Sequence, residues 1–310
     1  MNWQPSANLQ VIRERARIYR QIRSFFNNRG CLEVETPVLA STTNTDVQVS
    51  TIEVPGFDIP FYLQTSPEFA MKRLLAVGCG SIFQISHAFR QGETGRLHHP
   101  EFSLLEWYRT GYDYQQLMDE MELLITTLSL HQCSFTRITY KALFKEVMNL
   151  VVDEVALPEL RNHCAKSVPG TKAEEYDFDQ CLDLLLGVVI APTMRGYQFV
   201  YDYPLSQAAL ARVREDDNSV AERFELFFDG IELANGFSEL TDADEQRARF
   251  EQDSAARAQK GLPQYAIDER LLAALESGLD DCAGVALGLD RLLMVLLELD
   301  SIDQVLAFTD

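Results

Sequence analysis

Residues 89–108 read FRQGETGRLHHPEFSLLEWY, in which a short loop lies between two strand-like runs. The loop gathers Arg90, Arg96, His98 and His99. The chain as a whole carries a formal net charge of −20, from 27 basic and 47 acidic residues. Such local positive charge in an acidic protein can focus an anionic ligand. The stretch therefore predicts a strand–loop–strand unit that binds an anion.

The two strands of this unit present a polar face. Side chains along a strand alternate between the two faces of its sheet. One face would hold Gln84, Ser86, Arg90, Phe102, Glu106 and Tyr108. Such a face is a binding site if helices cover it and ordinary surface if solvent covers it. The pattern alone leaves both interpretations open.

A second stretch, FELFFDGIELANGFSEL at 224–240, is typical of a hairpin. Asp229-Gly230 between alternating runs is the pattern of a two-residue turn. The expected cross-strand pairs are Phe228–Ile231, Phe227–Glu232 and Glu225–Ala234. Glu225 and Glu232 would then form a diagonal pair about 7–8 Å apart. Two carboxylates at that spacing suit Mg²⁺, although a solvent-facing acidic strand is the alternative.

A third stretch, GVALGLDRLLMVL at 284–296, predicts a short strand followed by a helix. Gly284, Ala286 and Gly288 alternate along one strand face, and a face without side chains lets a flat ligand lie against the backbone. Arg291 at the helix start interacts unfavourably with the helix dipole, so we expect it to bind a negatively charged group. The pattern is neither GxGxxG nor a Walker loop, which argues against both nucleotide folds.

Hydrophobic periodicity and capping signals predict the other elements. Helices are expected at 9–30, 113–130, 139–150, 156–166, 176–190, 241–260 and 266–276, and strands at 31–39, 81–90, 101–108 and 198–203. Ser66 and Pro67 would be the N-cap and first residue of a further helix that runs to about Val77.

Composition argues against several classes of partner. No apolar run reaches the 18 or so residues that span a bilayer, and the first residues do not resemble a signal peptide. A sequence pI near 4.6 lacks the basic footprint of nucleic-acid binding. We therefore expect a cytoplasmic protein that binds no membrane, no DNA and no tRNA.

Together these stretches resemble the signature motifs of class II aminoacyl-tRNA synthetases, in particular their lysyl branch. Residues 25–39, FFNNRGCLEVETPVL, resemble motif 1, which forms a homodimer interface in the family, and 89–108 resemble motif 2. ELANGFSEL at 232–240 followed by GVALGLDR resembles motif 3. The resemblance implies an α+β class II aminoacyl-tRNA synthetase catalytic core, an antiparallel sheet flanked by helices. Residues 1–310 would be a single catalytic domain, with 131–195 a helical insertion.

The resemblance also implies an ATP site. Arg90 would bridge the α-phosphate and the substrate carboxylate, and Phe102 would stack on adenine with Arg291 on the far face. The other expected nucleotide contacts are Gln91, Gly92, Arg96, His98, His99, Glu232, Leu233 and Gly288, and Mg²⁺ would lie between Glu225 and Glu232. Gly92 replaces a family glutamate that contacts adenine, and Glu93 follows one residue late.

The same resemblance implies an amino-acid site. It would be lined by Ser66, Pro67, Glu68, Glu106, Tyr108, Asn235, Glu239 and Ala286. Glu106, Tyr108 and Glu239 would bind the distal ammonium, and Asn235 would lie near the carboxylate. A regular strand turns Asn235 away from Glu232, so both reach one site only if the chain bulges near Asn235-Gly236.

Two features indicate which branch the chain resembles. The motif 1 helix begins at about residue 9, which leaves no room before it for an anticodon-binding domain. Ala286 stands where lysyl-tRNA synthetases have glycine. The chain is therefore similar to a stand-alone branch that attaches (R)-β-lysine to a lysine of elongation factor P.

Three alternatives remain open at the level of sequence. A free-standing ligase for α-lysine or another amino acid would act on a different acceptor. A non-catalytic binding protein would show decay of the motif arginines, yet Arg90 and Arg291 are both present. A class II asparagine synthetase has similar length, but Glu106, Tyr108 and Glu239 argue against it.

Overall fold

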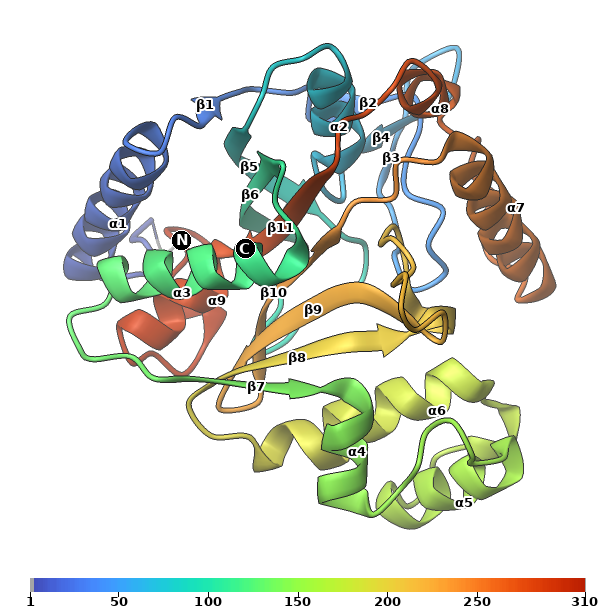
Figure 1. Cartoon of the computed structure of the whole chain (residues 1–310). Coiled ribbons are helices and arrows are strands. Elements are labelled where there is room, and N and C mark those ends of the chain that lie inside the picture. Colours follow the sequence, from blue (N-terminus) through green and yellow to red (C-terminus); the bar gives the residue numbers. More distant parts are fainter. Residues whose placement is uncertain (1–2, 310) are drawn as a thin grey trace. The chain divides into compact units, whose positions relative to one another are not determined.

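The computed structural model describes residues 3–309. The chain divides into two compact units, one made of 1–130 and 238–310 and the other of 131–237. Each unit has its own sheet segment and its own helices (Figure 1). The expectation that 1–310 behaves as a single domain stays a prediction.

The first unit is built on four strands. They are β1 (Leu32–Glu33), β5 (Ile82–Phe89), β6 (Glu101–Thr110) and β11 (Cys282–Gly288), adjacent in that order. β5, β6 and β11 pair antiparallel, whereas β1 runs parallel to β5. The two strands expected in the opening stretch are thus confirmed. The antiparallel pairing of β5, β6 and β11 agrees with the expected antiparallel sheet, and the short edge strand β1 adds one parallel pair.

One face of these strands is the core of the first unit. Helix α1 (Leu9–Asn27) packs Phe26 against Phe83 and Trp107, with ring centroids 4.8 and 5.2 Å apart. All three side chains are fully buried. Helix α3 (Tyr114–Leu128) contacts α1 and β11, and its Glu120 accepts a hydrogen bond from the Trp107 indole. The apolar face therefore points to these helices, and the polar set lies on the other face.

Further helices and a small sheet complete this unit. α2 (Glu68–Ala76) packs on α8 (Glu269–Glu276), which in turn contacts α7 (Ala243–Gln259), and α9 (Leu289–Leu296) contacts β6 and β11. The small sheet has the order β2 (Leu39–Ala40), β4 (Phe61–Leu63) and β3 (Glu53–Val54). A 3₁₀ turn spans Ile302–Gln304.

Helix α2 begins differently from the expectation. Pro67 occupies the N-cap position and no side chain caps the helix, so the prediction that Ser66 is the N-cap is wrong. The Ser66 hydroxyl still accepts a hydrogen bond from the Glu68 N–H at 3.0 Å. It also donates to a glutamate of β6, which shows that its main contact lies in the sheet.

The second unit has a helical layer on its own strands. β10 (Ile231–Ser238), β9 (Val220–Phe228), β8 (Tyr197–Pro204) and β7 (Phe135–Thr139) are adjacent in that order, with β7 parallel to β8. α4 (Tyr140–Met148), α5 (Leu157–Ser167) and α6 (Phe178–Leu185) enclose a separate hydrophobic core (Figure 1). A π-helical turn spans Leu186–Ile190, and 3₁₀ turns span Ala173–Glu175, Ala191–Thr193 and Leu205–Gln207. The helices expected in this region are confirmed, whereas β7 was not predicted.

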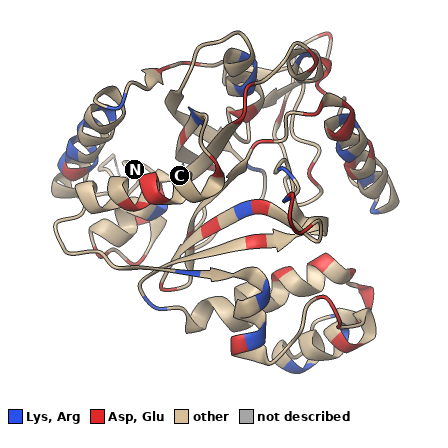
Figure 2. Ribbon diagram, in the orientation of Figure 1, with Lys and Arg blue, Asp and Glu red and all other residues tan. Residues whose placement is uncertain are grey.

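Charge is unevenly distributed along the first helix. Helix α1 carries five arginines and a single glutamate, so most of its charged positions are coloured blue on the ribbon of Figure 2, and several of these residues form ion pairs. Arg17 pairs with Glu14, and Arg23 pairs with Glu33 of β1. Arg15 donates to Asp290, the residue before Arg291, at 2.6 Å. Asp290 is 2% exposed and Arg15 is 21% exposed, so a partly buried pair ties α1 to the start of α9.

Candidate active site

Three glutamates of the first unit converge on one place, which we call the acidic cluster: the buried Glu106 and Glu239 and the partly buried Glu68. Glu68 is the first residue of α2, Glu106 lies in the middle of β6, and Glu239 follows Ser238. The cluster thus draws on three separate segments of the chain. The sequence assigned all three to the amino-acid site, and the structure brings them together.

Glu106 is held by two hydroxyl groups. The Tyr108 hydroxyl donates to Oε1 at 2.6 Å, and the Ser66 hydroxyl donates to Oε2 at 2.8 Å. Glu106 pairs with Gln84 on β5 and with Ala286 on β11, so all three side chains share the polar face. The alternation argument for one polar face is therefore confirmed.

Lys72 is a member of this site that sequence reasoning missed. Its ammonium lies 2.7 Å from Oε1 of Glu68 and 2.6 Å from Oε2 of Glu239, and its side chain is only 1% exposed. Glu68 and Lys72 are four residues apart on α2, the spacing at which helical side chains meet. That i,i+4 pattern, directly after the predicted helix start, is the signal that could have found it.

Burial perturbs the ionisation of the whole cluster. It raises the pKa of Glu106 to about 7, and the charge of Glu68 adds to the rise. It raises the pKa of Glu239 to about 8, although Lys72 opposes the rise. Burial disfavours the charge of Lys72, yet attraction to Glu239 and Glu68 outweighs burial and raises its pKa. The site therefore holds carboxyl groups that change charge near neutral pH.

Gly284 makes the packing of this cluster possible. A Cβ at this position would lie 2.3 Å from Oε1 of Glu239 and 2.4 Å from Cε1 of Tyr108. The expectation that the bare strand face leaves space for a ligand is wrong at Gly284, because the protein's own side chains occupy it. Ala286, two residues on, stands opposite Glu106 in the strand register. It is the residue of this face that we expect next to the substrate.

Arg90 and Phe102 lie together beside the motif 2 loop. The Arg90 guanidinium carbon is 5.1 Å from the centroid of the Phe102 ring. Nη1 of Arg90 is 3.5 Å from Oε1 of Glu93, at the limit of an ion pair. Nε of Arg90 is buried and donates no hydrogen bond to any residue between 3 and 309. A buried donor of this kind suits an anionic ligand such as a phosphate.

The loop backbone explains the glycine at 92. Gly92 has φ +82°, a conformation that L side chains rarely adopt, and open space surrounds it. Gln91 is anchored by its N–H, which donates to the Ser50 carbonyl at 2.8 Å. Gly95 and His98 exchange two backbone hydrogen bonds, and His99 contacts the Glu101 backbone through Nδ1. A glutamate at position 92 would strain this turn, and Glu93 points to Arg90 instead.

Two hydrogen bonds join the loop to the C-terminal segment. Arg291, near the start of α9, donates through Nε to the Leu97 carbonyl at 3.2 Å. Arg96 donates to the Asp300 carbonyl at 2.9 Å. Arg291 thus lies against the loop whose sequence it was expected to complement. Gly288 is the residue immediately before α9.

The second unit carries the remaining predicted residues on its hairpin. The turn is confirmed, with positive φ at Asp229 and Gly230. The expected Glu225–Ala234 pair is wrong, because the register shifts between Glu232 and Ala234 and Glu225 faces Asn235.

The register shift is a β-bulge, and it decides which strand face carries Asn235. The shift around Leu233 puts Asn235 on the same strand face as Glu232, which a regular strand forbids. The bulge is real, but it lies before Asn235 and not at Asn235-Gly236. Glu232 is exposed, whereas Leu233 and Ala234 are buried.

Glu225 is engaged with a neighbouring arginine. Nη2 of Arg223 donates to Oε1 of Glu225 at 2.6 Å, and Nε of Arg223 donates to Oδ1 of Asn235 at 3.1 Å. Burial raises the pKa of Glu225 to about 7; Arg223 opposes the rise and Glu232 adds to it. The repulsion shows that the two carboxylates lie close enough to interact.

Glu225 and Glu232 are the candidate ligands for Mg²⁺ on this hairpin. Within residues 3–309 no group of three or more His, Cys, Asp or Glu residues could hold a metal ion. Mg²⁺ commonly takes one or two carboxylates and completes its shell with water and substrate phosphates. The Glu225–Glu232 pair fits that role, and the assignment stays a prediction.

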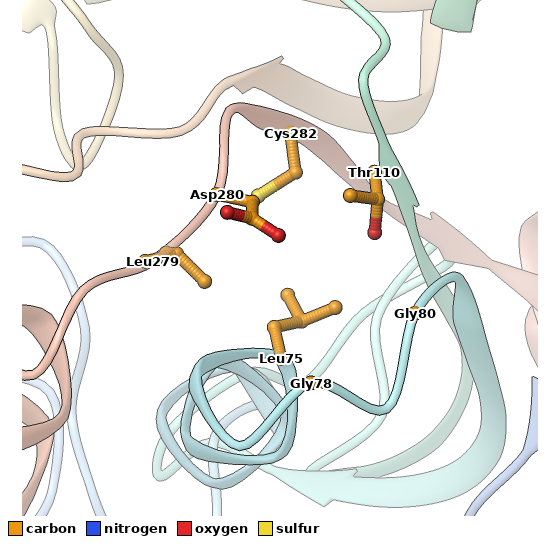
Figure 3. A pocket seen from close by; sticks show the side chains of 7 residues that line it. All are labelled: Leu75, Gly78, Gly80, Thr110, Leu279, Asp280 and Cys282. Atoms are coloured by element: carbon orange, nitrogen blue, oxygen red, sulfur yellow. The ribbon is translucent and has the colours of Figure 1, made fainter.

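A small cavity lies beside Cys282. Its volume is about 90 Å³, which is too little for a nucleotide. It is lined by Leu75, Gly78, Gly80, Thr110, Leu279, Asp280 and Cys282 (Figure 3). Glu239 reaches this wall through its N–H, which donates to the Cys282 carbonyl at 2.9 Å.

Comparison with known proteins shows the family. The model of tRNA synthetases class II (D, K and N) matches residues 1–310, and the chain belongs to this family. It is 48% identical to the elongation factor P–(R)-β-lysine ligase of Vibrio parahaemolyticus over 99% of this chain and 98% of that protein. The ligases of the same name from Vibrio cholerae and Klebsiella pneumoniae are 48% and 46% identical, over 99% of this chain and 97% of each relative.

These matches confirm the predicted fold class and the resemblance to the lysyl-type branch. Within residues 3–309, no helix combines the length and apolar character that a membrane crossing requires.

Proposed function

We propose that this protein is an ATP-dependent ligase that activates (R)-β-lysine and transfers it to the ε-amine of a lysine of elongation factor P. The near full-length identity of 46–48% to ligases of that name is the observation that carries the proposal. The buried acidic cluster supports it independently, since three carboxylates beside Tyr108 suit a substrate with cationic groups. A translation-related ligase of this type would act in the cytoplasm.

The first step would form an aminoacyl-adenylate. A carboxylate oxygen of β-lysine attacks the α-phosphorus of ATP, and the bond to the bridging oxygen breaks to release pyrophosphate. Arg90 would bind the α-phosphate and the substrate carboxylate, and Arg291 would bind the polyphosphate. Mg²⁺ held by Glu225 and Glu232 would neutralise phosphate charge. Electrostatic stabilisation of this kind is usually the largest single contribution to such a step.

The second step would form the amide. The ε-amine of the acceptor lysine attacks the acyl carbon, AMP leaves with the electron pair of the broken bond, and the amine loses a proton. An unperturbed lysine has a pKa near 10.4, so only about one in 2,500 is neutral at pH 7. The acceptor amine must therefore be deprotonated on the enzyme.

The adenine contacts need a separate assignment, because Gly92 replaces the expected glutamate. Phe102 would stack on the base, and Gln91, His98 and His99 surround the turn that Gly92 makes possible. Gly92 offers backbone groups in place of a side chain. We expect these backbone groups to contact the adenine amino group.

We also propose a homodimer formed through the motif 1 region. Leu32 of β1 is 54% exposed and Val38 is 39% exposed, close to an open sheet edge. Light scattering after size exclusion should give twice the chain mass. Leu32→Glu should shift the protein to monomer, while an unchanged mass in this variant would contradict the proposed interface.

The function is tested in two assays. Amino-acid-dependent pyrophosphate exchange is compared for (R)-β-lysine, α-lysine, aspartate and asparagine, and β-lysine should support the fastest exchange. Elongation factor P is then incubated with enzyme, ATP and β-lysine, and its mass should rise by one lysyl unit. Exchange without modification of elongation factor P would favour the alternative, a free-standing amino-acid ligase with another acceptor. No exchange with any amino acid would contradict both.

A further inference from the structure

Lys72 occupies an unusual position for a lysine. Its ammonium is buried between two glutamates, 2.7 Å from Glu68 and 2.6 Å from Glu239. Burying a charge is costly unless partners compensate it. The burial of Lys72 between two glutamates therefore needs a structural explanation. Oε1 of Glu239 is fully buried, yet accepts no hydrogen bond in the described part of the chain. The acidic cluster therefore still has an unsatisfied acceptor when Lys72 is in place.

Counting charges shows what the cluster lacks. Glu68, Glu106 and Glu239 carry three negative charges when ionised, and Lys72 supplies one positive charge. Two negative charges remain uncompensated. A substrate with two ammonium groups would neutralise them, and its ammonium hydrogens could satisfy the free carboxylate oxygens.

We propose that Lys72 is a positioning residue and internal counter-ion. It holds Glu68 and Glu239 in place and limits the acidic cluster to two uncompensated charges, so that the cluster selects amino acids carrying two ammonium groups. This inference rests on the proposed function for its substrate class. Without Lys72 the cluster would hold three uncompensated carboxylates and would take up protons instead of substrate.

The surroundings of the cluster agree with this role. Glu239 faces Lys72 and Glu68 of α2, Glu106 and Tyr108 of β6, and Cys282 of β11. Lys72 is the cation among the groups that influence Glu239, and it lowers the pKa of both Glu106 and Glu239. It therefore keeps carboxylates ionised that burial would otherwise neutralise.

The test compares Lys72→Met with a variant that restores the charge count, the double variant Glu68→Gln with Lys72→Met. Lys172→Met is the matched control, because Lys172 is 72% exposed. In pyrophosphate exchange, Lys72→Met should raise the KM for (R)-β-lysine at least tenfold, while kcat and the KM for ATP change less than threefold. The double variant should recover a large part of the loss.

A binding measurement makes the test independent of catalysis. Calorimetry with (R)-β-lysine alone, in two buffers of different ionisation enthalpy at pH 7, reports the protons released on binding. Wild-type protein should release protons because the carboxyl groups must ionise, and Lys72→Met should release more. 6-Aminohexanoate, which has one ammonium, should bind the wild-type protein at least 100-fold more weakly.

Specific outcomes would overturn the inference. One is a Lys72→Met protein with unchanged KM and unchanged proton release. Another is a double variant no better than Lys72→Met, which would show that Lys72 only supports the fold. Equal binding of 6-aminohexanoate and β-lysine would refute the charge count even if Lys72→Met does not fold. Absence of exchange with β-lysine, together with the predicted binding and proton release, would contradict the proposed function and leave this inference intact.

Discussion

The substitution Gly284→Ala tests the packing of the acidic cluster. Its Cβ would lie 2.3 Å from Oε1 of Glu239 and 2.4 and 2.5 Å from Tyr108 ring carbons, whereas ordinary contacts begin at 3.4 Å. The two neighbouring side chains must each move by about 1 Å. Both are almost fully buried and are held by other contacts, so they have little room to move.

The expected size of the effect follows from overpacking. Extra methyl groups in a well-packed region cost about 1–3 kcal/mol. Gly284 lies in β11 and not in the left-handed region, so the backbone accepts alanine and the cost lies in the contacts. If most of this cost reduces substrate affinity, the KM for (R)-β-lysine should rise about 5- to 150-fold. The KM for ATP should stay within about twofold, because Arg90 and Arg291 are not displaced.

Pyrophosphate exchange measures both constants, and thermal unfolding measures the stability of the variant. Gly187→Ala is the control, because a Cβ at Gly187 meets nothing within 4 Å. That variant should behave as wild type. A Gly284→Ala enzyme with wild-type KM for β-lysine would refute the reasoning, since it would show that the side chains of Glu239 and Tyr108 can move without weakening substrate binding.

Three further predictions concern the same unit. Ala286→Gly should increase the use of α-lysine in pyrophosphate exchange, and an unchanged amino-acid preference would remove Ala286 as a selectivity residue. Burial raises the pKa of Glu106 to about 7 and that of Glu239 to about 8, from an ordinary value of 4.5. At pH values between the ordinary pKa and these raised pKa values, the folded protein without substrate therefore binds more protons than the unfolded chain. This difference in bound protons should make the free energy of unfolding fall as the pH rises from 5 to 8. Over the same pH range, the increase in melting temperature that β-lysine causes should grow. A ligand-induced increase that shrinks as the pH rises would contradict the assignment. Asp290→Asn removes the buried carboxylate that pairs with the partly exposed Arg15 and should lower the free energy of unfolding by about 1.5–3 kcal/mol, as measured by denaturant titration, whereas a loss below 1 kcal/mol would show that the pair is dispensable.

Local patterns in the sequence were enough for much of the fold. The turn at Asp229-Gly230, the alternation in β5 and β6 and the periodicity of α1 are set by residues close together in the chain, and each was confirmed. The strand expected at 31–39 is confirmed at Leu32–Glu33, but its parallel pairing with β5 was not predicted, and neither was the strand β7. The direction in which a strand pairs depends on a distant partner, and the five-residue β7 carries too short an alternation to be recognised.

The sequence predicted which residues line the candidate site, but not which of them contact one another. Motif positions alone indicated Glu106, Tyr108 and Glu239, whereas nothing in the sequence singled out Lys72. Its role depends on Glu239, which lies 167 residues away in the sequence (239 − 72). A buried ion pair between residues so far apart in the chain produces no periodic pattern in the sequence.

The sequence by itself determined most of the helices and strands, the hairpin turn and the residue types that any ligand site here must use, because backbone preference and side-chain alternation act locally. Only the tertiary structure decided that Gly284 makes room for Glu239 and Tyr108, that a bulge brings Asn235 to the face of Glu232, and that Lys72 lies between two glutamates. The physical reason is that close packing and charge compensation depend on which distant segments meet, and the cost of a clash or of a buried charge exists only after they have met.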